Sequence, residues 1–245
     1  MVMQESLRRS GDWLFRRRSY VPVVIFPAVI VTVAAQAHPV PLEHERLWEA
    51  VCFLVSILGM AVRAWTIGTA PAHTSGRNQG RQIAAQLNTT GPYSLVRNPL
   101  YVGNALMWAG VVMYARSAWL AVAVALVFWL VYERIVYAEE EFLRERFGAA
   151  FTEWAAVTPP FIPSFRRYRP AGLAFSFRTV LRREYSGLFA VVILFTIEVL
   201  AWWRFSTGQW YADPVWLSAA AAAGVLYLSL RAMKHRTRVL HVDGR

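Results

Sequence analysis

Residues 91–103 read GPYSLVRNPLYVG, and residues 138–148 read AEEEFLRERFG. The first stretch places Arg97 at the start of an apolar segment, and the second places Glu139 and Glu140 at the end of the next one. If the two segments form a hairpin, an arginine and two carboxylates converge at one end of it. The rest of the chain then serves to hold this charged site in a lipid bilayer.

The composition supports a membrane protein. The 245 residues are 56% hydrophobic and 17% charged, whereas a soluble domain is typically about 45–50% apolar and about 25% charged. Eleven tryptophans fit this pattern, because tryptophan favours membrane–water interfaces. The net charge is +11. The basic residues flank apolar segments and are not interleaved with exposed aromatic residues, so we expect no nucleic-acid partner.

The sequence predicts an all-α polytopic membrane protein with about six transmembrane helices. A spanning helix needs about 20 mostly apolar residues, within a range of about 17–25. The six candidates are residues 20–37, 47–67, 99–115, 117–137, 187–203 and 214–232. The third and fourth are separated by three residues at most, so they must form an antiparallel hairpin.

The distribution of basic residues predicts the orientation, because cytoplasmic loops collect lysine and arginine. In this chain they gather at the N-terminus, in the loops 68–98 and 138–186, and in the C-terminal tail. The opposite side carries Arg46, Arg116 and Arg204 alone. We therefore expect a multi-pass protein of the inner or plasma membrane, with both termini and the charged site facing the cytoplasm.

The chain divides into four predicted parts. They are a basic cytoplasmic N-terminus (1–19), two transmembrane helices (20–67), a core with a cytosolic loop, the hairpin 99–137, a helical extension and a proline-rich segment (68–186), and two C-terminal transmembrane helices with a basic tail (187–245). The extension is expected to continue the fourth apolar segment as one helix from about residue 117 to 156, because neither proline nor glycine interrupts it before Phe147.

Arg97 and the glutamates are the strongest candidates for a functional site. A single arginine at a membrane boundary often just extends to the interface, but Arg97 precedes Asn98 and Pro99, which restrict the chain where a helix begins. An arginine held there can bind a carboxylate or phosphate through two hydrogen bonds. Glu139 and Glu140 could also lie on a solvated helix face, and at most two adjacent glutamates can face one pocket.

Other polar residues are weaker candidates. Glu198 lies within the fifth apolar segment, where an acidic residue is costly and therefore a candidate for function, although its side chain could reach the nearby interface. His73 is a lone histidine in an inner loop. The sequence has no cluster of histidines and cysteines, so we expect no metal site.

Together the two opening stretches resemble the isoprenylcysteine carboxyl methyltransferase and phospholipid methyltransferase family of integral membrane enzymes. That family carries Gly-x-Tyr, Arg-His-Pro-x-Tyr-x-Gly, then Glu-Glu-x-x-Leu-x-x-x-Phe-Gly-x-x-Tyr-x-x-Tyr and a trailing proline. The matching residues are Gly91, Tyr93, Arg97, Asn98, Pro99, Tyr101 and Gly103, then Glu139, Glu140, Leu143, Phe147, Gly148, Phe151, Trp154, Pro160 and Pro163. The resemblance covers about residues 60–165.

The resemblance implies transfer of a methyl group from S-adenosylmethionine to an oxygen or nitrogen of a lipid or lipidated acceptor that enters from the bilayer. Arg97 and Glu140 would be catalytic: Arg97 orients an anionic acceptor, and Glu140 positions the acceptor or the cofactor's ammonium group. The cofactor would be bound by Tyr93, Asn98, Pro99, Tyr101, Gly103 and Glu139.

Three positions depart from the family pattern. Asn98 replaces the usual histidine, which keeps hydrogen bonding but removes a titratable ring. Phe151 and Trp154 replace two tyrosines, which keeps packing and removes hydroxyl groups. A general base at residue 98 is therefore not expected.

Two other classes of protein stay open. A small transporter is disfavoured, because no inverted repeat is evident and the charge gathers at one face instead of the membrane midplane. A non-catalytic scaffold or partner subunit is favoured by Asn98 and disfavoured by the presence of Arg97, Tyr101 and the glutamate pair. Binding of S-adenosylmethionine separates the enzyme from both.

Overall fold

The structure is a computed structural model that describes residues 3–38, 42–71, 74 and 84–244. Within these residues all regular structure is helical, which confirms the predicted all-α fold. His73 lies outside the described residues.

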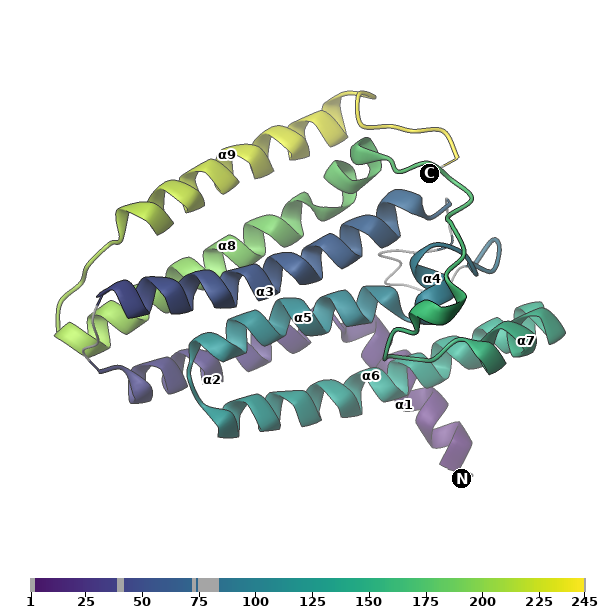
Figure 1. The fold of residues 1–245 in the computed structure, drawn as a ribbon, viewed down its shortest axis with the longest axis horizontal. Helices are drawn as coiled ribbons and strands as arrows, with labels where there is room; N and C mark the ends of the chain where they lie inside the picture. Colours follow the sequence, from purple (N-terminus) through teal and green to yellow (C-terminus); the bar gives the residue numbers. More distant parts are fainter. Residues whose placement is uncertain (1–2, 39–41, 72–73, 75–83, 245) are drawn as a thin grey trace.

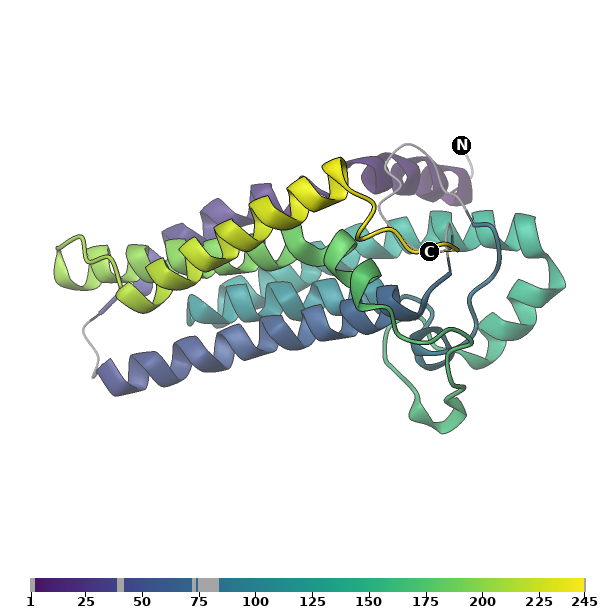
Figure 2. The same cartoon turned by 90° about the horizontal axis from the view of Figure 1, so that it is seen from above.

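In the described chain six long helices lie side by side along the length of the molecule (Figures 1 and 2). Each corresponds to one predicted apolar segment. They are α2 (Val21–Gln36), α3 (Leu42–Thr69), α5 (Pro99–Tyr114), α6 (Ala118–Phe147), α8 (Phe177–Thr207) and α9 (Pro214–Arg236). The shorter elements are α1 (Met3–Arg17), α4 (Pro92–Leu95), α7 (Ala149–Val157) and a 3-10 turn, η1 (Phe165–Arg167).

The long helices make this a multi-pass membrane protein. In the described chain four helices, α3, α6, α8 and α9, are long and apolar enough to cross a membrane. The pair α1 and α2, bent by 73°, makes a fifth if it is counted as one span. Helix α5 has 16 residues. The count of six spans and the cytoplasmic placement of the termini stay predictions.

The helices begin where local signals place them. The Ser117 hydroxyl accepts a hydrogen bond from the Leu120 amide at the start of α6, and the Ser176 hydroxyl does the same for Thr179 in α8, both at 3.3 Å. Helix α5 begins at Pro99, whose fixed φ angle suits a first helical position.

The expectation of one helix over 117–156 is wrong at Gly148. This residue has φ = +54°, a left-handed conformation that glycine adopts without steric cost. Helix α6 therefore ends at Phe147, and α7 turns back from it (Figure 2). Within α7, Phe151 and Trp154 lie one turn apart and make an edge-to-face contact, with ring centroids 5.8 Å apart.

Helices α3 and α5 approach each other closely through glycines. A Cβ atom added at Gly103 would lie 2.8 Å from the carbonyl oxygen of Gly59 and 2.5 Å from Cγ of Arg63. The Ser56 hydroxyl also donates to the carbonyl of Met107 at 2.8 Å. Small residues and interhelical hydrogen bonds are typical of packing between transmembrane helices.

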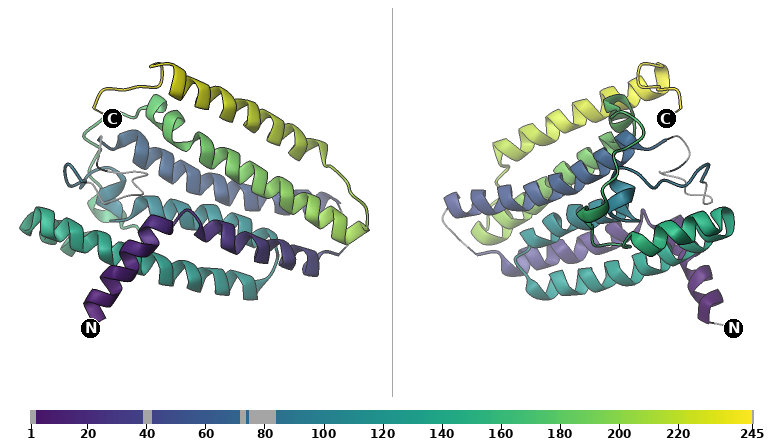
Figure 3. Two further views of the ribbon diagram at one scale, coloured as in Figure 1. Left: turned by 180° about the vertical axis from the view of Figure 1, so that it is seen from behind. Right: turned by 45° about the vertical axis from the view of Figure 1, so that its right-hand side comes forward.

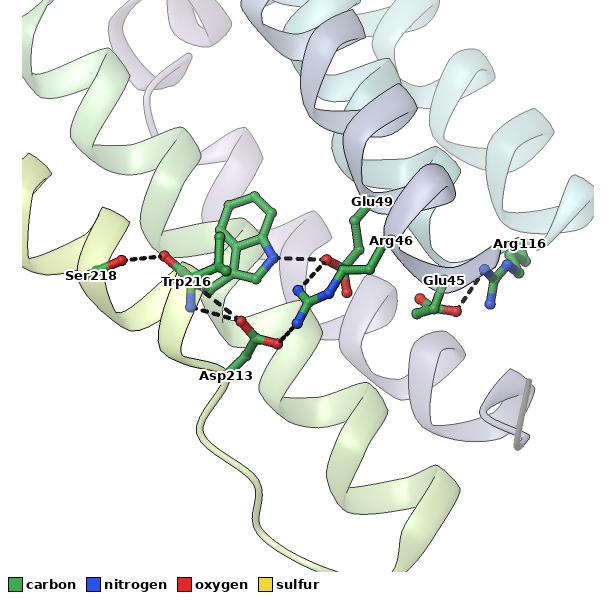
Figure 4. A network of polar contacts seen from close by, with 8 residues as sticks. Glu45, Arg46, Glu49, Arg116, Asp213, Trp216 and Ser218 are labelled. Carbon is green, nitrogen blue, oxygen red and sulfur yellow. Dashed lines mark hydrogen bonds and ion pairs between the residues drawn. The ribbon is translucent and has the colours of Figure 1, made fainter. Parts of the chain in front are cut away.

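Ion pairs join the helices at the end of the bundle away from α4 and α7 (Figure 4). Arg116, in the link between α5 and α6, donates to Glu45 of α3 at 2.7 Å. Arg46 of α3 pairs with Glu49 and with Asp213, the residue that caps α9. The three carboxylate side chains are at most 5% exposed.

Helix α1 lies against α6 and leaves the direction of α2 at a sharp angle (Figure 3). Arg8 and Glu145 form an exposed ion pair with an N–O distance of 2.6 Å. Phe15 is buried in a cluster with Tyr101 and Tyr132. The predicted basic N-terminus is thus a helix that packs on the end of α6.

Candidate active site

A cavity of about 540 Å³ lies at the end of the bundle that carries α4 and α7. Its volume falls in the range of about 300–1,000 Å³ that is typical of small-molecule sites. Seven of the eight predicted site residues line it: Tyr93, Arg97, Asn98, Pro99, Tyr101, Glu139 and Glu140. The structure therefore brings together residues that lie more than forty positions apart in the sequence.

Arg97 and Glu140 form an ion pair in the cavity wall. Nη1 of Arg97 donates to Oε2 of Glu140 at 2.9 Å, and the side chains are 17% and 19% exposed. Nε of Arg97 and Oε1 of Glu140 are buried and have no hydrogen-bond partner among the described residues. A buried polar atom without a partner is costly, so these two atoms mark polar capacity that the described residues leave unused.

Tyr101 and Glu139 form a second polar pair beside the first. The Tyr101 hydroxyl donates to Oε2 of Glu139 at 2.9 Å, which joins the first turn of α5 to the end of α6. The guanidinium of Arg18, from the link between α1 and α2, also lines the cavity and lies over the Phe15 ring at 3.9 Å. The walls of this end thus carry both cations and carboxylates.

The proline-rich segment after α7 is bound to the corner that holds Arg97. The backbone amide of Arg97 donates to the carbonyl of Pro159 at 2.8 Å, and Nδ2 of Asn98 donates to the carbonyl of Pro160 at 3.1 Å. The Trp154 indole donates to the carbonyl of Tyr93 at 3.2 Å. Asn98 therefore lines the cavity while its amide holds the proline-rich segment in place.

Among the predicted site residues, Gly103 does not line the cavity in the described part of the chain. Its place is the close contact between α3 and α5, where Arg63 covers it. The structure thus shows Gly103 at a helix–helix contact beside Arg63, and a direct contact with a cofactor stays a prediction.

Sequence reasoning missed a polar group at the deeper end of the cavity. Arg63 donates to both carboxylate oxygens of Glu184, at 2.8 and 2.7 Å, and to Oδ1 of Asn104 at 2.7 Å. Asn104 in turn donates to the Tyr132 hydroxyl at 3.2 Å. All four residues line the cavity. Polar residues within apolar segments were a usable signal for this group. Glu184 was nevertheless assigned to a loop, because the predicted segment began at residue 187, whereas α8 begins ten residues earlier, at Phe177.

Comparison with protein families finds a match over the segment that carries most of the site residues. Residues 48–150 match the model of a family described as phospholipid methyltransferase. The match includes the corner at Arg97, both helices that follow it, and the glutamate pair. The match covers less than half of the chain, and over this part the chain is similar to the phospholipid methyltransferase family. The resemblance given by the sequence motifs is thereby confirmed.

Two curated relatives are similar over about half of the chain. The cobalt-zinc-cadmium resistance protein CzcN of Cupriavidus metallidurans is 36% identical over 131 residues, which is 51% of this chain and 57% of that protein. The nickel-cobalt-cadmium resistance protein NccN of Alcaligenes xylosoxydans is 34% identical over 130 residues, 52% of this chain and 57% of that protein. The chain thus spans little more than half the length of these relatives. No solved structure matches it.

Proposed function

We propose that the chain is an S-adenosylmethionine-dependent membrane methyltransferase that acts on a lipid or lipidated acceptor. The observation that carries the proposal is the Arg97–Glu140 ion pair, whose two side chains line a ligand-sized cavity. The pair lies in the segment that matches the phospholipid methyltransferase family.

The residues of the cavity fit S-adenosylmethionine. The Glu140 carboxylate can accept from its ammonium group, and the aromatic side chains of Tyr93, Phe151 and Trp154 line the same cavity. The cofactor, when bound, supplies a methyl group that is already activated on a positively charged sulfur. Aromatic faces attract such a cation. Asn98, Pro99, Tyr101 and Glu139 complete the proposed cofactor site.

The proposed task of Arg97 is to orient the acceptor. Its guanidinium lines the cavity and can donate to an oxygen of a carboxylate or phosphate. Such an oxygen is already ionised near neutral pH, so no base has to remove a proton, which fits a site with asparagine at residue 98. Holding two reactants in line is itself a large source of rate enhancement.

The far wall of the cavity favours an amphipathic acceptor. Pro22, Met107 and Trp108 line the cavity from α2 and α5, two of the apolar helices of the bundle. An acceptor with an apolar chain would place that chain there and its head toward Arg97. The names of CzcN and NccN concern metal resistance. If this chain takes part in such a process, we propose that it does so by methylating a membrane lipid.

The test is methyl transfer by purified, detergent-solubilised protein supplied with methyl-labelled S-adenosylmethionine and a total lipid extract. Label in a discrete lipid, absent with the Glu140→Gln protein, supports the proposal and leads to the acceptor by mass spectrometry. Saturable cofactor binding without labelled lipid points to a protein acceptor. Neither label nor binding contradicts the proposal and favours the scaffold or the transporter.

A further inference from the structure

A chain of hydrogen bonds crosses the cavity end of the bundle from α8 to α6. It runs from Glu184 to Arg63, on to Asn104, and ends at the Tyr132 hydroxyl. Glu184 lies outside residues 48–150, the segment matched to the family. The two hydrogen bonds from Arg63 to Glu184 hold the Arg63 guanidinium in one orientation.

The order of donors and acceptors in this series of hydrogen bonds determines the direction of the last one, between Asn104 and Tyr132. Arginine can only donate hydrogen bonds, so the Asn104 atom that faces Arg63 must be the carbonyl oxygen Oδ1. The amide nitrogen of Asn104 therefore faces Tyr132 and donates to its hydroxyl oxygen. Because that oxygen already accepts a bond from Asn104, the Tyr132 hydroxyl hydrogen is left to donate in another direction.

Packing fixes where the Tyr132 hydroxyl can donate. The Tyr132 ring is stacked on Phe128, with centroids 4.1 Å apart, and tilted against Tyr101 at 4.6 Å. Tyr132 lines the cavity and precedes Glu139 by seven residues on α6. This spacing puts both on one face of the helix, with Tyr132 about 10 Å deeper. Tyr132 thus lines the cavity with its ring held in place, and a ligand in the cavity is the partner to which its hydroxyl hydrogen can be directed.

We propose that Tyr132 binds the head of the methyl acceptor by donating its hydroxyl hydrogen to a carboxylate or phosphate oxygen. Asn104, Arg63 and Glu184 are positioning residues that keep the hydroxyl pointing at the acceptor. The apolar part of the acceptor lies against Met107 and Trp108, which line the same cavity. This inference rests on the proposed methyl transfer and names its acceptor as an oxyanion-bearing lipid.

The test compares Tyr132→Phe and Asn104→Asp, which remove the same hydrogen bond in two ways. Tyr132→Phe deletes the hydroxyl. Asn104→Asp keeps an acceptor for Arg63, but the introduced carboxylate can only accept, so the Tyr132 hydroxyl turns to donate to it and is lost to the acceptor lipid. Both variants should raise the half-saturating concentration of total lipid extract about tenfold or more, as expected for a hydrogen bond to a charged group.

Three further readouts separate this role from packing. The Kd of S-adenosylmethionine should stay within about twofold of wild type, and the double variant should be no worse than Tyr132→Phe alone. The matched control is Tyr137→Phe, which should behave as wild type. Tyr137 lies on the same helix but does not line the cavity in the described part of the chain.

Other outcomes overturn the inference in distinguishable ways. A Tyr132→Phe protein that uses lipid as wild type does shows that the hydroxyl makes no contact with the acceptor. A raised Kd for S-adenosylmethionine in both variants shows that it faces the cofactor instead. A wild-type protein that neither binds the cofactor nor transfers label contradicts the proposed function itself, before any variant is compared.

Discussion

Buried pairs of arginine and carboxylate occur at both ends of the bundle, and they differ in what surrounds them. At the end shown in Figure 4, Arg116 pairs with Glu45, and Arg46 joins Glu49 to Asp213, so that each arginine ties one helix to another or to a link. At the other end, the pair Arg97–Glu140 also joins a link, the one between α4 and α5, to helix α6, but both side chains line a cavity.

The difference separates a structural role from a functional one. Glu45 is completely buried, so the loss of its partner would leave a carboxylate in a low-dielectric interior. Arg97 and Glu140 are partly exposed to the cavity, so each can be hydrated when the other is removed. At both ends an arginine in a link between helices pairs with a glutamate on a helix, so residue type alone does not tell the two pairs apart. The cavity beside Arg97 and Glu140 distinguishes the functional pair from the structural one.

The largest expected effect is on activity at the cavity end. Arg97→Ala removes the guanidinium that we propose orients the acceptor and should lower methyl transfer by about 100-fold or more, a loss typical of deleting one preorganised donor. The thermal midpoint should change little, because the remaining carboxylate faces the cavity. Labelled transfer and thermal unfolding in the same detergent measure both effects. Unfolding of the variant would give this pair the same structural role as the distal ones.

The converse effect is expected at the opposite end. Arg116→Ala leaves the buried Glu45 carboxylate without its cation and should destabilise the protein by about 3–5 kcal/mol. Transfer per folded molecule should be unchanged, because the pair lies far from the cavity along the bundle (Figure 1). Arg116→Lys is the matched control, since it keeps a cation near Glu45. A variant that unfolds as wild type does would mean that Glu45 holds no charge to be balanced.

A smaller effect tests how Gly103 acts on the site. In Gly103→Ala the new methyl group meets the backbone of Gly59 and the side chain of Arg63, and such overpacking typically costs about 1–3 kcal/mol. The thermal midpoint should fall while the Kd of S-adenosylmethionine changes less. Gly172→Ala is the control, because a Cβ there meets nothing within 4 Å. A large loss of cofactor affinity without loss of stability would instead support direct contact with the cofactor.

The sequence predicted features that depend on local pattern. Apolar length identified all six long helices, and the residues around Pro99 and Glu139 identified most of one cavity wall, because each lies at the end of its own helix. The turn at Gly148 was missed, since a single glycine after an amphipathic run does not reveal its φ angle. The Arg63–Glu184 pair joins residues 121 positions apart, and its existence depends on which helices lie side by side, which periodicity does not encode.

The smallest expected effect concerns α1, which contributes Phe15 to the same cavity. Arg8 and Glu145 are about half exposed, and exposed ion pairs typically contribute at most about 1 kcal/mol. Arg8→Ala should therefore leave stability and transfer near wild type, whereas Phe15→Ala empties a site in the cluster of Tyr101 and Tyr132 and should weaken both. Measured side by side, the pair of variants shows whether α1 is held by charge or by packing. A large loss in Arg8→Ala alone would show that the exposed ion pair, and not the buried phenylalanine, holds α1 over the site.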